Sequence, residues 1–79
     1  MLLAEPIKGK LLMLTVKDVI ERVQKIFDIR DDDEMAHIYE DDLYLDVLKA
    51  IAEGKCDNPA ACAREAVKAD EIQFSRWHS

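Results

Sequence analysis

The chain has 79 residues, 49% of them hydrophobic and 35% charged, with 17 acidic against 11 basic residues and a formal net charge of −6. This length allows one domain at most, and the apolar fraction argues against general disorder. The acidic excess disfavours binding to nucleic-acid phosphates, and two glycines and two prolines are too few for a turn-rich all-β fold. We therefore expect a small all-α, three-helix domain that binds no nucleic acid.

The N-terminal segment and the cysteines both bear on the cellular compartment. In residues 1–14, Pro6 and Gly9 interrupt the apolar run, which is therefore too short for a secretory signal or a membrane span. We expect these residues to form an extended strap across the helices. Two cysteines are too few for a secreted disulfide framework. The sequence thus predicts a cytoplasmic protein that does not bind membranes, with Cys62 as a small core residue.

The first helix is predicted over residues 15–27. Thr15, with Asp18 three residues later, has the form of a capping box. Apolar residues follow at the spacing of one helical face. They are Val16, Val19, Ile20, Val23, Ile26 and Phe27. We expect this face to lie against the core.

The second helix is predicted over residues 33–53. One of Asp31, Asp32 and Asp33 is expected to cap its N-terminus, and Gly54 suits the position just after its end. Apolar residues occupy more than half of its circumference, so the helix needs cover from two sides. The two other helices could each supply one side, or a second subunit could, which makes a homodimer an open alternative.

The third helix is predicted over residues 58–69. Asp57 or Asn58 can cap it, and Pro59 fits the first turn. Its inner positions are mostly small, which lets a helix approach its neighbour closely. They are Ala60, Cys62, Ala63, Ala66 and Val67.

Residues 70–79 form the tail of the single helical domain, which we place at residues 15–79. Ile72 and Phe74 alternate with polar residues, so an extended tail packed back on the helices is expected. Trp77 either anchors this tail on the core, which we favour, or contacts a partner.

The negative charge is concentrated in residues 28–46, which contain nine acidic residues and one basic residue. This stretch carries −8, so the rest of the chain carries +2. Part of the run is explained by helix capping and by a solvated face. The functional interpretation is a surface for a protein partner with a basic surface. Its candidate residues are Asp31, Asp32, Asp33, Glu34, Glu40, Asp41, Asp42, Arg76 and Trp77.

A metal site is the alternative interpretation of the same helix. Glu34 and His37 have the Glu-x-x-His spacing found in carboxylate-bridged di-metal bundles, and Glu40 and Asp41 lie within one turn of His37. One chain holds one such motif, so a symmetric dimer would have to supply the second. The alternative function is therefore a metal-binding helical dimer or a metal-dependent hydrolase. The pattern names no catalytic residue and requires no cofactor.

Two further stretches carry a resemblance. The helix contains Ala36-His37-x-x-Glu40-Asp41, and the tail reads Ile72-x-Phe74-x-Arg76-Trp77. Both are similar to those of a group of small bacterial and phage helical proteins without an assigned activity. The resemblance covers about residues 16–77 and implies a small domain that includes its tail. We expect an interaction protein rather than an enzyme, such as a phage or mobile-element accessory factor.

Overall fold

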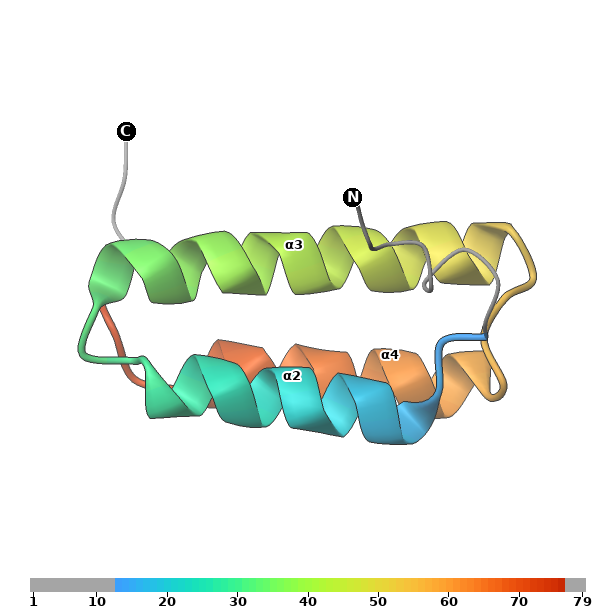
Figure 1. The fold of residues 1–79 in the computed structure, drawn as a ribbon, viewed down its shortest axis with the longest axis horizontal. Helices are drawn as coiled ribbons and strands as arrows, with labels where there is room; N and C mark the ends of the chain where they lie inside the picture. The colour runs from blue at the N-terminus through green and yellow to red at the C-terminus, as the bar shows by residue number, and fades with distance from the viewer. Residues whose placement is uncertain (1–12, 77–79) are drawn as a thin grey trace, which may run out of the picture.

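The computed structural model describes residues 13–76, and in this range the chain forms three packed α-helices and no strand. The predicted all-α, three-helix fold is therefore confirmed. The elements are α2 (Val16–Asp28), α3 (Asp33–Ala52), α4 (Pro59–Val67) and the short 3₁₀ helix η2 (Lys68–Glu71). Figure 1 shows α3 lying along α2 and α4, which pack beside each other on one side of it. Residues 1–12 of the predicted strap lie outside the described range.

Each helix begins where the local sequence predicts. The side chain of Thr15 accepts a hydrogen bond from the amide of Asp18, whose carboxylate accepts one from the amide of Thr15, which completes the capping box. Of the three candidate aspartates, Asp32 is the N-cap of α3. Asn58 caps α4, with Pro59 at its first position.

The helix ends differ slightly from the predicted ones. The helix α3 stops at Ala52, and Gly54 has a φ of +71°, a left-handed conformation that glycine adopts without a steric penalty. The third helix is α-helical only as far as Val67 and continues as η2. The backbone of Ile72 is extended, but the chain bends at Ile72 and Phe74, and Asp70 and Glu71 of the predicted tail belong to η2.

The core lies between α3 and the α2–α4 pair. Its fully buried side chains include Val19 and Ile26 of α2, Leu43 of α3, and Cys62 of α4. Small side chains on α4, such as Ala66, let the three helices pack closely. Ala60 and three large apolar residues that the helical patterns place inside are instead exposed. The three large residues stand out. They are Ile20 (47% exposed), Phe27 (44%) and Val67 (59%). They lie beside the buried line of their helix, beyond the width that the neighbouring helices cover.

The helix α3 is covered on one side within the part of the chain that the structure describes. Both α2 and α4 contact α3, and in Figure 1 they lie on the same side of it, so they do not cover it from two sides. The other alternative, cover by a second subunit, stays a prediction. The opposite side, here called the outer face, exposes Ile38, Leu45 and Leu48 at 43%, 50% and 64%. None of the helices between residues 13 and 76 is long and apolar enough to cross a membrane.

The start of α2 is tied to the loop between α3 and α4. The amide of Leu14 donates to the carbonyl oxygen of Lys55 at 2.7 Å, and the amide of Asp57 donates to that of Leu14 at 3.1 Å. These bonds form an isolated parallel bridge between Leu14 and Cys56. The bridge brings Cys56 into the interior, where it is 7% exposed beside the fully buried Cys62, and both thiols are free.

These two thiols should be nearly unreactive in the native protein. Burial raises the pKa of the Cys62 thiol to about 11, with a further contribution from neighbouring Cys56. Because the thiolate is the reactive form, we expect an aromatic disulfide reagent at about pH 8 to react at least about 100-fold faster in urea than in buffer. The absorbance of the thiolate released from the reagent measures the reaction rate. In the Cys56→Ser variant only Cys62 remains, so the rate measured there belongs to Cys62. Rapid native labelling of Cys62 would contradict its burial.

Candidate functional site: the charged residues of α3 and the tail

A buried carboxylate lies at the middle of α3. Glu40 is only 3% exposed, although it belongs to the acidic run. Arg76 Nε donates to Glu40 Oε1 at 2.9 Å, and the hydroxyl of Tyr44 donates to Glu40 Oε2 at 2.8 Å. Both oxygens therefore have a partner, as a buried charge requires. Glu40 thus belongs to the interior and not to the candidate partner surface.

Arg76 also fastens the tail to the helices. Its Nη2 donates to the carbonyl oxygen of Ala69 at 2.8 Å, and its guanidinium lies 3.9 Å from the centre of the Phe74 ring. The amide of Ser75 donates to Asp33 Oδ1 at 3.2 Å, which binds the tail to the start of α3. The tail is therefore packed on the helices as predicted, and Arg76 acts within the fold. Trp77, the other candidate in the tail, lies outside the described residues.

The Tyr44 hydroxyl should make the folded protein less stable as the pH rises into the alkaline range. Burial raises its pKa above the ordinary value of 10.0, and the hydrogen bond to Glu40 raises it further. The unfolded chain ionises above pH 10 while the folded chain does not, so the stabilisation is present below pH 10 and is lost as the pH rises. We expect the free energy of unfolding, measured by urea titration, to fall more steeply above pH 10 in the wild type than in Tyr44→Phe. The difference between the two slopes should reach up to about 1.4 kcal/mol per pH unit.

Tyr39→Phe is the matched control, because Tyr39 is also a half-buried tyrosine of α3. It should keep the alkaline loss of stability seen in the wild type. Identical pH profiles for the wild type and Tyr44→Phe would disprove the role of Tyr44.

Several acids of the run have partners within the fold. Asp32 caps α3, Asp33 accepts from Ser75, and Asp46 Oδ2 lies 2.9 Å from Arg22 Nη1 on α2. Four of the candidate residues for a partner surface are exposed and do not serve these contacts. They are Asp31, Glu34, Asp41 and Asp42. The structure therefore divides the predicted surface into acids that build the fold and acids that face outward.

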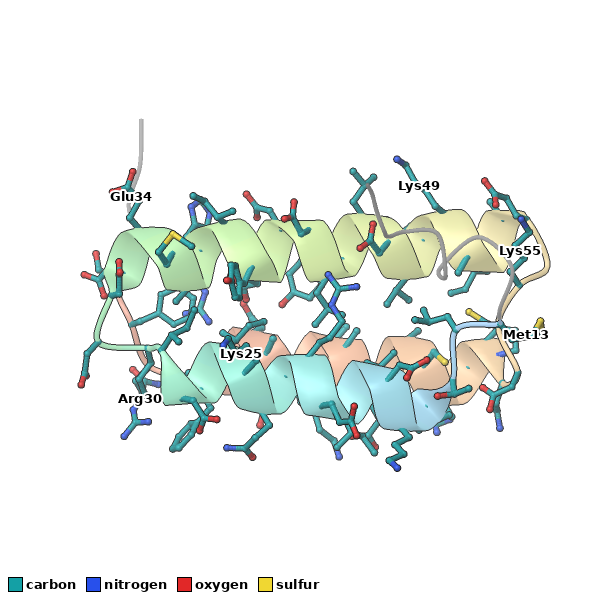
Figure 2. The ribbon with its side chains drawn as sticks, in the orientation of Figure 1. Met13, Lys25, Arg30, Glu34, Lys49 and Lys55 are labelled. Carbon is teal, nitrogen blue, oxygen red and sulfur yellow. The ribbon has the colours of Figure 1, made fainter. Side chains whose placement is uncertain are left out.

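The candidate metal ligands are not gathered around one point. His37 Nε2 lies 3.5 Å from Asp41 Oδ2, one turn along α3. Glu40 is instead directed inward to Arg76, and Glu34 points away from α2 and α4 (Figure 2). Between residues 13 and 76, no three His, Cys, Asp or Glu side chains are placed to hold a metal ion. The metal site therefore stays a prediction to which the geometry adds no support.

An open cleft of about 200 Å³ lies between α2 and α3. Its lining consists of Arg22, Lys25, Tyr39 and Asp42. Among the described residues that line the cleft there is no serine, threonine or cysteine, and Arg22 is bonded to Asp46. The lining could hold a small polar group by charge.

Comparison with family models, with curated proteins and with solved structures finds no match to this chain.

Proposed function

We propose that this protein is a protein-binding module that meets a basic partner through exposed acids of α3 and of the turn before it. The proposal places this encounter in the cytoplasm, because the two cysteines are not bridged. A phage or mobile-element accessory factor is the kind of protein we have in mind, on the strength of the resemblance in the helix and tail. Such a factor would act by occupying its partner rather than by catalysis.

One observation carries this proposal. The 19 residues from 28 to 46 hold nine acids and one base, whereas the rest of the chain is slightly basic. Contacts within the fold use part of these acids, and Asp31, Glu34, Asp41 and Asp42 remain exposed. A one-signed surface of this kind speeds the approach of an oppositely charged partner and repels partners of like charge.

A pull-down from an extract of the source cells tests the proposal. The test variant neutralises four exposed acids, one in the turn before α3 and three on α3, and changes the net charge from −6 to −2. It combines Asp31→Asn, Glu34→Gln, Asp41→Asn and Asp42→Asn. We expect proteins retained by the wild type at about 50 mM salt to be lost from this variant and from the wild type at about 500 mM salt.

The control variant removes four exposed acids elsewhere, so that it has the same net charge. It combines Glu21→Gln, Glu53→Gln, Asp70→Asn and Glu71→Gln. It should retain the partner, because the proposal depends on the position of the charge and not on its total. Equal recovery of the same proteins by all three forms would rule the proposal out.

A further inference from the structure

The outer face of α3 has the pattern of a helix-pairing surface. Ile38, Leu45 and Leu48 are spaced by seven and three residues, which are the a and d positions of a heptad. All three are exposed, although large aliphatic side chains are usually buried. With 20 residues, α3 is the longest of the three helices and extends over about 30 Å. This face therefore offers an exposed seam, apolar at these three positions, onto which another helix could pack.

The charges beside the seam decide which helix fits. Figure 2 shows Glu34 and Lys49 pointing away from α2 and α4, on the side of the outer face. Asp41 and Asp42 are exposed and lie within one turn of Leu45, so acids outnumber the single lysine. A second copy of this chain would bring the same acidic excess to the interface, and like charges across an interface disfavour pairing. Charge complementarity therefore favours a basic occupant.

Asp41 narrows the choice further, because it lies within the seam. It is one turn from both Ile38 and Leu45, at the d position between them. A helix that covered these two side chains would also cover the Asp41 carboxylate. A carboxylate removed from water is destabilising unless a cation pairs with it. Within this chain His37 Nε2 lies 3.5 Å from Asp41 Oδ2, which is longer than a charge-assisted hydrogen bond, so an occupant with a lysine or arginine opposite Asp41 is favoured.

We infer that the outer face of α3 binds a basic amphipathic helix of a partner protein, with aliphatic side chains on Ile38, Leu45 and Leu48 and a lysine or arginine on Asp41. This inference rests on the proposed function and specifies the kind of partner. Recognition of an amphipathic helix by an apolar surface is a recurring mode in proteins. Here the apolar contact supplies affinity, and the pairing with Asp41 sets the register.

Fluorescence anisotropy with two designed peptides tests the inference. Both are three-heptad helices with leucine at the a and d positions and lysine at e and g. They differ at one d position, which is arginine in the arginine peptide and leucine in the leucine peptide. We expect the wild-type chain to bind the arginine peptide about tenfold more tightly than the leucine peptide. Asp41→Leu should reverse this preference, because it removes the carboxylate that arginine pairs with.

Two double variants distinguish binding at the seam from nonspecific binding to exposed apolar side chains. Leu45→Gln with Leu48→Gln should weaken binding of the arginine peptide at least about tenfold. Ile20→Gln with Val67→Gln removes exposed apolar side chains from α2 and α4 and should bind it unchanged. All four residues are exposed, so both variants should keep the wild-type circular dichroism spectrum. Equal binding of the peptide by the two double variants would overturn the inference.

Other occupants give different results. Sedimentation of a wild-type dimer that Leu45→Gln with Leu48→Gln dissociates would identify a second copy as the occupant. Failure of the wild type to bind either peptide would overturn the inference and favour residues 1–12 as the cover of the face. In the extract experiment, a partner could still bind the Leu45→Gln, Leu48→Gln variant but not the variant without the four acids. This result would overturn the inference about the helix and would still agree with the proposed function.

Discussion

Replacement of Arg76 by alanine is expected to lower the free energy of unfolding by about 3 kcal/mol. The substitution leaves the Glu40 carboxylate 3% exposed without its cation, and it removes the bond that holds the tail to Ala69. A domain of this size has a total stability of about 4–12 kcal/mol, so the loss is a large share. Urea denaturation followed by circular dichroism measures it.

Two controls show whether the buried charge is the cause. Arg64→Ala removes an arginine from an exposed position of α4 and should change stability by less than about 0.5 kcal/mol. Glu40→Leu combined with Arg76→Leu should be more stable than Arg76→Ala, because it leaves no orphaned carboxylate. The explanation fails if Arg76→Ala and Arg64→Ala unfold at the same urea concentration.

Replacement of Leu43 by alanine is expected to destabilise the protein by about 3 kcal/mol. Leu43 is fully buried where α3 meets the other two helices, so its truncation opens a cavity that the surrounding side chains fill only in part. Thermal and urea unfolding both report the change. The three small residues Ala36, Ala66 and Ala69 near this core leave little side-chain volume that could move in to compensate.

The same substitution on the outer face is the matched control. Leu48→Ala changes the same side chain on the same helix, but Leu48 is 64% exposed. We expect it to change stability by less than about 0.5 kcal/mol. If Leu43→Ala and Leu48→Ala were equally destabilising, the outer face would be covered in the folded protein.

The helices could be predicted from the sequence because their signals are local. Thr15 and Asp18 cap α2 through bonds that span three residues, and Asn58 with Pro59 marks the start of α4 in the same way. Such contacts depend on neighbouring residues and not on the rest of the fold. The alternation of Ile72 and Phe74 likewise predicts a tail packed on the helices, where Ile72 is buried.

The arrangement of the charges could not be predicted in the same way. The sequence groups Glu40 with Asp41 and Asp42, because all three belong to one acidic run. Its burial depends on Arg76, which lies 36 residues away and arrives from the tail. A signal was nevertheless present, since Glu40 stands between Ala36 and Leu43 on the apolar line that faces inward. The exposure of Ile20 and Phe27 likewise depends on how much of α2 its neighbours cover.

The buried Glu40 also determines how α3 is rotated about its own axis against the other two helices. A helix with apolar side chains on every side could turn about its own axis and still bury a similar apolar area. A shift by one residue is a turn of about 100°, which would carry the Glu40 carboxylate away from Arg76 and Tyr44. Alternative orientations of α3 are thereby penalised, and Ile38, Leu45 and Leu48 are held on the outside. The carboxylate that the acidic run predicts as part of a binding surface thus determines which side of the helix is left exposed.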